Sequence, residues 1–162
     1  MHIEHVVMNA SPFICLSESG LIHLLPKLFK EIIVPDIVCN EIVAKGKIDN
    51  ASRFLHAYNW LKQVKDILLL PSVLSWDLGK GESAVLSYAI QHPGNWAGID
   101  DREARRCALS LGCRYIGTVG IVLLAKRRGI IPNVYDNLRK LQDAGLWLSE
   151  IFIKEVCRMA GE

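Results

Sequence analysis

One stretch near the middle of this 162-residue chain constrains its fold more than any other. The apolar residues 96–99 are followed by two adjacent carboxylates, Asp100 and Asp101. This order, with a helical pattern directly after it, is typical of a strand, an acidic turn and a helix, and ligands of open α/β sheets bind at such strand ends. The two carboxylates repel each other unless a cation or a basic group lies between them. The apolar face of the predicted helix carries Ala104, Cys107, Ala108 and Leu111.

The rest of the chain alternates in the same way. Short apolar runs at residues 6–8, 32–34 and 114–117 predict further strands, and helical patterns lie between them. Residues 49–58 are predicted to be helical, residues 60–70 to be a connection with one edge strand, and residues 71–76 to be a loop. Glycines after helical patterns predict where helices end: Gly20, Gly112, Gly129 and Gly145. This alternation predicts one α/β domain over residues 1–162, with a mainly parallel sheet.

Composition restricts the class of protein further. Hydrophobic residues make up 51% and charged residues 22%, which indicates a globular chain, and a net charge of +2 permits a nucleic-acid partner without requiring one. The sequence shows no signal peptide, and its longest uncharged apolar run, residues 117–125, is too short to cross a bilayer. We therefore expect a cytoplasmic protein with no membrane partner. Five scattered cysteines without a CxxC pair fit reduced thiols better than disulfides or a zinc ribbon.

Two glutamates lie on the apolar faces of predicted helices. Glu41 follows Ile37 by four positions and precedes Ala44 by three, and Glu82 shares a face with apolar residues at the start of another helix. Each has an ordinary explanation, because Glu41 can reach water at the edge of its helix and the helix dipole favours an acid in a first turn. Glycines at positions 79 and 81 allow another segment to approach the start of the second helix closely.

Asn9 lies at a strand-to-helix turn of the same kind as Asp100, and Ser11 and Pro12 predict the start of the helix after it. Buried carboxylates need a countercharge, and Lys45 is the one basic residue on the inward-facing stripes. A hard divalent cation with oxygen ligands satisfies these groups together, which favours Mg²⁺ or Mn²⁺. No cysteine has a partner histidine in a recognisable nucleophile motif. The histidines show no spacing typical of zinc ligands: His2, His5, His23, His56 and His92.

In order and spacing, these segments resemble the PIN-domain family. The matching segments are residues 6–12, Val34-Pro35 before Glu41, residues 79–84 with Glu82, residues 99–102, Gly117-Thr118 and residues 125–129. The resemblance covers about residues 6–161 and implies a three-layer α/β/α fold with a Mg²⁺- or Mn²⁺-dependent ribonuclease site. Many such proteins resemble toxins of toxin–antitoxin pairs, so the resemblance implies RNA, a second copy of the chain and a small DNA-binding antitoxin as partners.

The resemblance also assigns residues to the site. The acidic positions of the family fall on Asn9, Glu41, Glu82 and either Asp100 or Asp101. All five are therefore candidate metal ligands, and Glu82, Asp100 and Asp101 are candidate catalytic residues that orient or deprotonate the attacking water. Asn9 departs from the family pattern, because an amide oxygen can hold a metal directly or through water but brings no charge and should weaken binding.

Basic side chains are the candidates for nucleic-acid binding, because phosphate groups attract them regardless of sequence. Three arginines lie on the predicted outer side of the helix after Asp101, and three further basic residues end the helix that begins near Thr118. The latter cluster also fits a helix C-terminus, and Thr118 can bind a phosphate or simply cap its helix. The candidates are Arg102, Arg105, Arg106, Thr118, Lys126, Arg127 and Arg128.

Two other interpretations remain. In the first, the same fold is a binding module for RNA or protein whose site Asn9 has weakened. In the second, the chain is a phosphoacceptor receiver domain, but the acidic pair lies late in the chain and the expected lysine at a strand end is missing.

Overall fold

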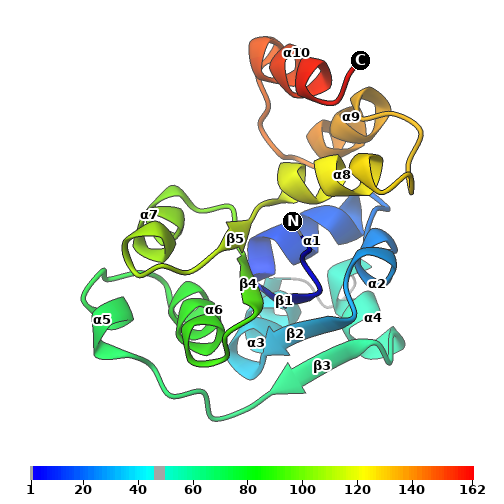
Figure 1. Cartoon of the computed structure of the whole chain (residues 1–162). Coiled ribbons are helices and arrows are strands. Elements are labelled where there is room, and N and C mark those ends of the chain that lie inside the picture. The colour runs from blue at the N-terminus through cyan, green and yellow to red at the C-terminus, as the bar shows by residue number, and fades with distance from the viewer. Residues whose placement is uncertain (1, 46–49) are drawn as a thin grey trace.

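The computed structural model describes residues 2–45 and 50–162. Within them, five strands form one parallel sheet in the order β3-β2-β1-β4-β5 (Figure 1). Central strand β1 pairs Val7 with Ile33 of β2 on one side and with Ala97 of β4 on the other. The strands are β1 (His5–Met8), β2 (Glu31–Pro35), β3 (Leu61–Val64), β4 (Asn95–Gly98) and β5 (Tyr115–Ile116).

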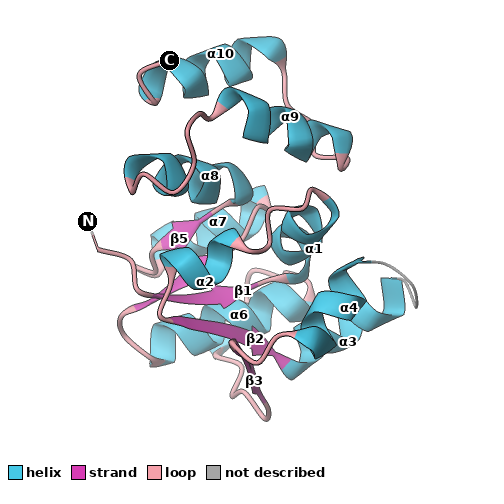
Figure 2. Cartoon of the chain, turned by 90° about the vertical axis from the view of Figure 1, so that its right-hand side faces the viewer, coloured by secondary structure: helices cyan, strands magenta, loops and turns pink. Residues whose placement is uncertain are grey.

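The helices of the described residues are α1 (Ala10–Glu18), α2 (Leu24–Leu28), α3 (Asp36–Lys45), α4 (Asn50–Ala57), α5 (Pro71–Leu74), α6 (Lys80–Gln91), α7 (Arg102–Ser110), α8 (Thr118–Arg127), α9 (Tyr135–Asp143) and α10 (Glu150–Met159). Helix α6 packs on β1, β2 and β4, and α7 packs on α6. Helices α1 and α8 lie on the opposite side of β4 from α6 and α7 (Figure 1). Figure 2 shows α8, α9 and α10 stacked one beyond another. The predicted α/β/α architecture is therefore confirmed.

The sheet brings two strand ends together at its centre. Strands β1 and β4 are neighbours, but the chain leaves β1 toward β2 and leaves β4 toward β5, in opposite directions. A crevice opens at the carboxyl ends of two such strands, and ligands of open α/β sheets bind there. Asn9 directly follows β1, and its backbone N–H donates to the carbonyl of Gly98, at the end of β4, at 2.9 Å. Asn9 and Asp100 therefore lie at the same crevice.

Most predicted elements are present, with a few differences at their ends. The glycines predicted to end helices have φ angles of +76° (Gly20), +69° (Gly112), +70° (Gly129) and +105° (Gly145), the conformation that glycine adopts most readily. The loop predicted at residues 71–76 is wrong in part, because Pro71 begins the one-turn helix α5. The predicted edge strand is β3. Helix α4 begins at Asn50, and the predicted first helical residue, Asp49, lies outside the described residues.

Candidate metal centre

Asn9 is the most unusual polar residue of the crevice. It occupies the N-cap position of α1, but its side chain makes no capping hydrogen bond, so the cap predicted from Ser11 and Pro12 is wrong by two positions. The residue is only 2% exposed, and no group among the described residues donates a hydrogen bond to its Oδ1. Leaving a buried acceptor without a partner costs about 1–3 kcal/mol. This oxygen is therefore suited to a cation or another donor.

The carboxylate of Glu41 faces the same point as the Asn9 oxygen. Helix α3 carries Glu41, and the backbone N–H of Gly81, in the first turn of α6, donates to its carboxylate. A Cβ placed on Gly81 would lie 2.7 Å from Oε2 of Glu41 and 2.9 Å from Oδ1 of Asn9. Both oxygens therefore converge on the space that the missing side chain of Gly81 leaves, and a larger residue there would displace them.

Glu82 completes this group from the first turn of α6, where the sequence predicts it. Its carboxylate lies over Gly79, where an added Cβ would be 2.5 Å from Oε2. Burial raises the pKa of Glu41 above its ordinary value, and the negative charge of Glu82 raises it further, although the Gly81 N–H and Lys45 act in the opposite direction. Two carboxylates and one amide oxygen thus lie near one another at the crevice, where Lys45 is the cation that acts on Glu41 among the described residues.

The raised pKa of Glu41 predicts a specific dependence of stability on pH. Between the ordinary carboxyl pKa and the raised value, the folded state binds more protons than the unfolded state, so the free energy of unfolding falls as pH rises through this interval. Urea unfolding of the metal-free protein over a pH series measures this slope. We expect Glu41→Gln to flatten it, and an unchanged slope in this variant would assign the effect to another group.

Asp100 lies in a second group of contacts, beside the first. Its Oδ1 accepts hydrogen bonds from the backbone N–H of Thr118 at 2.8 Å and from Nη2 of Arg105 at 3.3 Å. Its Oδ2 accepts from the Thr118 hydroxyl at 2.5 Å. Thr118 is the first residue of α8 and Gly117 is its N-cap, so Thr118 binds Asp100 rather than capping its helix.

Arg105 is the basic group that lies against Asp100. The prediction that Arg105 lies on the outer side of its helix is wrong, because its guanidinium also donates from Nε to the carbonyl of Ile99 at 3.2 Å. A Cβ on Gly117 would overlap this guanidinium, so the glycine makes the contact possible. The spacing of apolar residues did not reveal this contact. A usable signal in the sequence is that Arg105 lies one turn after the acidic pair.

Asp101 stabilises the start of α7. It is exposed and caps α7, and its Oδ2 accepts a hydrogen bond from the Ala104 N–H at 2.9 Å. The sequence left open which of the two aspartates faces the site. The structure turns Asp100 toward Thr118 and uses Asp101 as a cap, so it does not bring Asp101 together with Glu41 and Glu82.

The basic candidates are separated in space. Arg102 is exposed at the start of α7, near the crevice, and Arg106 forms an exposed ion pair with Glu103 at 3.1 Å. The cluster of Lys126, Arg127 and Arg128 ends α8 at the opposite, amino edge of the sheet. There the Arg128 guanidinium donates to the backbone carbonyls of Leu28 and Ile3, and Lys126 pairs with Glu162 at 3.3 Å. The structure does not bring this cluster to the acidic residues, because α8 runs away from them.

The donor set of the crevice fits a hard divalent cation. Among residues 2–45 and 50–162, no three His, Cys, Asp or Glu side chains are grouped as a ready metal site. Nevertheless, two carboxylates share the crevice with the unpartnered Asn9 oxygen in the cradle over Gly81. Oxygen donors of this kind are the ligands that Mg²⁺ and Mn²⁺ prefer. Glu41, Glu82 and Asn9 are therefore the residues that would hold the ion.

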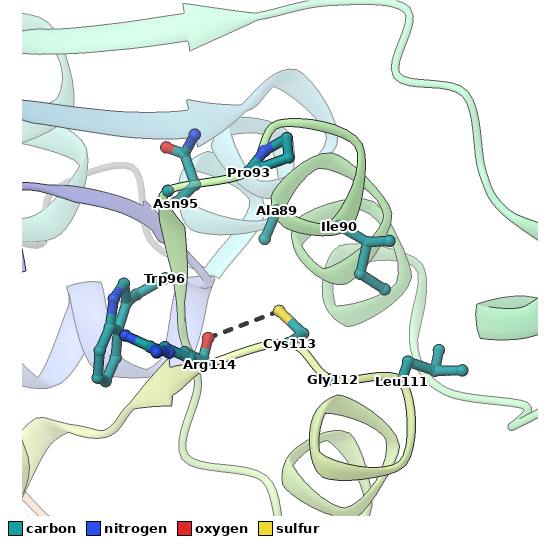
Figure 3. Close-up of a pocket in the computed structure, with 10 residues that line it drawn as sticks. Ala89, Ile90, Pro93, Asn95, Trp96, Leu111, Gly112, Cys113 and Arg114 are labelled. Carbon is teal, nitrogen blue, oxygen red and sulfur yellow. Dashed lines mark hydrogen bonds between the residues drawn. The ribbon is translucent and has the colours of Figure 1, made fainter.

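Cavities lie on both edges of the sheet. The cavity in Figure 3, of about 310 Å³, is at the amino end of β4, where Arg114 lies over the ring of Trp96, and its lining contains none of the acidic candidates. A cleft of about 440 Å³ lies at the other edge and begins at Asp100 and Arg105. Tyr115, Leu148 and Phe152 are among its walls. Of these two, the second cleft is therefore the one beside Asp100.

The cysteines do not contribute a nucleophile to the site. Burial raises the pKa of the Cys15 thiol to about 11, with a smaller contribution from the nearby Asp100, and burial likewise raises those of Cys39 and Cys113 to about 11. These thiols are protonated at neutral pH, whereas nucleophilic cysteines are thiolates.

These features define an α/β protein with a carboxylate site at the switch point of a parallel sheet. A family model described as PIN domain matches residues 5–162. The chain therefore belongs to the PIN-domain family, whose members are generally nucleases. A comparison with curated proteins finds no match. None of the helices in the described part of the chain has the length and apolar character needed to cross a membrane.

Proposed function

We propose that this chain is a Mg²⁺- or Mn²⁺-dependent endoribonuclease that hydrolyses phosphodiester bonds of RNA. The observation that carries the proposal is the buried, unpartnered Oδ1 of Asn9, which faces the Glu41 carboxylate over Gly81. A nuclease site needs such a place, where a cation is held by oxygen atoms that the protein has already oriented. The nuclease character of the family supports the proposal.

The residues of the crevice have distinct roles in this proposal. When bound, the divalent cation supplies Lewis acidity, which promotes ionisation of a water molecule and offsets negative charge on phosphoryl oxygens. Asn9, Glu41 and Glu82 would hold the ion, and the Gly81 N–H keeps the Glu41 carboxylate in place. Glu82, at the start of α6, orients the attacking water and accepts its proton. Asp100 keeps Thr118 and Arg105 in position.

RNA suits the surroundings of the site better than a small substrate does. The cleft beside Asp100 and Arg105 is open, and its walls combine the aromatic rings of Tyr115 and Phe152 with aliphatic side chains. Bases of single-stranded nucleic acid stack on such rings, while basic groups bind the phosphates. Arg102 lies exposed on the same side of the sheet and is the further candidate for a phosphate contact.

We also propose a toxin role, with cytoplasmic location, a dimeric state and an antitoxin partner. The surface feature that supports a protein partner is an apolar patch at the start of α10. Trp147 is 85% exposed, Ile151 is 83% exposed and Phe152 is 43% exposed. Large apolar side chains exposed on one short segment, residues 147–152, support a protein partner, and either a second copy of the chain or an antitoxin would cover this patch.

The test is cleavage of single-stranded RNA by the purified protein with Mn²⁺. We expect cleavage that EDTA stops and that Glu82→Gln abolishes, because the amide cannot accept the proton of the attacking water. Glu103→Gln is the matched control, since Glu103 is also in the first turn of a helix but pairs with Arg106 on the surface. If Glu82→Gln cleaves as well as the parent protein, the activity belongs to another site or to a contaminant.

The second candidate function is a PIN-like module that binds RNA or protein without cleaving. Asn9 favours it, because the amide gives the site one negative charge fewer than a carboxylate would. Binding of 2′-O-methyl RNA, with no cleavage of ordinary RNA at any Mn²⁺ concentration, would support this module over the nuclease.

A further inference from the structure

The oxygens of Asp100 differ from the side-chain oxygen of Asn9 in how many hydrogen bonds they accept. Both Asp100 oxygens accept hydrogen bonds, two at Oδ1 and one at Oδ2, from Thr118 and Arg105. By contrast, the Asn9 oxygen has no partner among the described residues. A metal ion at Asp100 would compete with these contacts and would lie close to the Arg105 guanidinium. An ion at Asn9 would give its buried Oδ1 the partner that it lacks among the described residues.

The positive charge beside Asp100 is the guanidinium of Arg105, which several groups hold in place. The Arg105 guanidinium donates to the carbonyl of Ile99 and lies 5.4 Å from the centre of the Tyr115 ring, where the ring face attracts a cation. Gly117 leaves the space that the guanidinium fills. These contacts hold the guanidinium against Asp100.

Charge balance favours a single divalent ion, since Lys45 already offsets part of the Glu41 charge. Glu41 and Glu82 contribute two negative charges, which one divalent cation balances, and Asn9 contributes none. Asp100 contributes one negative charge, which Arg105 balances at 3.3 Å. A second divalent ion at Asp100 would be repelled by the guanidinium and by the first ion.

We propose that the site binds one divalent cation, at Asn9, Glu41 and Glu82, and that the Arg105 guanidinium supplies the second positive charge, at Asp100. This inference rests on the proposed nuclease function. The Arg105 side chain keeps 37% of its surface exposed while Asp100 keeps 19%, and Arg105 lines the cleft of about 440 Å³. Its exposed edge therefore faces the phosphate of a bound RNA, and a guanidinium pairs with two phosphate oxygens at once.

The test is the number of Mn²⁺ ions bound by the full chain, measured by isothermal titration calorimetry and by the paramagnetic resonance signal of free Mn²⁺. We expect one ion per chain. Arg105→Ala, and Arg105→Met with a side chain that still fills space, should each expose Asp100 and allow a second ion. Adding Asp100→Asn to either variant should return the number to one. Arg106→Ala on the same helix is the control and should leave one ion.

Two results would overturn the inference while leaving the nuclease proposal intact. The first is binding of two ions by the parent protein. The second is a loss of affinity for the single ion in Asp100→Asn as large as in Glu41→Gln, which we expect to weaken binding about 100-fold. Binding of no Mn²⁺ by the folded parent protein would overturn both proposals. Circular dichroism of each variant identifies those that are folded.

Discussion

Replacing Gly81 with alanine is expected to weaken divalent-cation binding about 10- to 100-fold and to lower the free energy of unfolding. The added methyl group would lie 2.7 Å from the Glu41 carboxylate and 2.9 Å from the Asn9 amide oxygen. At these distances both side-chain oxygens must shift from the positions in which they face each other. The effect on stability is diagnostic in sign, since alanine in place of glycine in a helix is otherwise stabilising by up to about 1 kcal/mol.

Calorimetric titration with Mn²⁺ and urea unfolding measure the two consequences. Gly120→Ala is the matched control, because Gly120 also lies in the first turn of a helix and its added methyl would meet only the side chain of Ile116, at 3.0 Å, which is not a candidate ligand. We expect this control to bind Mn²⁺ like the parent protein. Parent-like affinity in Gly81→Ala would show that the cradle over Gly81 is not the metal site.

Replacing Asn9 with aspartate is expected to have opposite effects on the metal-free and metal-bound protein. Without metal, the introduced carboxylate would be buried beside Glu41 and Glu82, and its repulsion and desolvation should lower the free energy of unfolding by on the order of 2 kcal/mol. With metal, the additional charge should tighten Mn²⁺ binding by about tenfold. Thermal unfolding should therefore shift more on addition of Mn²⁺ in this variant than in the parent protein.

Asn95→Asp provides a matched control for this experiment. Asn95 also has a side-chain oxygen that is buried and without a hydrogen-bond partner among the described residues, but it lies at the amino end of β4, away from Glu41 and Glu82. We expect this control to leave Mn²⁺ affinity unchanged. If titration finds the same affinity in Asn9→Asp as in the parent protein, Asn9 is not a ligand.

The strand ends and the helices with inward-facing glutamates could be predicted from the sequence, because the burial of one face gives apolar residues a regular spacing along each element. Glu41 and Glu82 lie on apolar stripes, and the structure places both at the crevice. The same reasoning could not separate Asp100 from Asp101. Two adjacent carboxylates point in different directions, and the choice depends on Thr118, a residue that follows another strand.

Arg105 and the basic end of α8 show why the remaining site residues could not be predicted. Arg105 does not lie on the apolar stripe of α7, so the spacing of apolar residues does not predict that it turns toward Asp100. Its side chain can do so because Gly117 has no side chain there. Basic residues at the end of a helix fit both a helix C-terminus and phosphate binding, and the spatial direction of α8 decides where they lie. Such long-range placement leaves no periodic pattern in the sequence.

The strand order has a consequence for when the protein becomes functional during synthesis. Three of the four strand pairings join strands that follow each other in the chain. The fourth joins β1 to β4 and pairs Met8 with Gly98, so it forms only after β4 has been synthesised. Closing so large a loop is slow, because its entropic cost comes before the contacts that repay it. Asn9 and Glu41 leave the ribosome long before Glu82 and Asp100. The candidate metal site is therefore incomplete in a nascent chain, and it forms only after β1 has paired with β4.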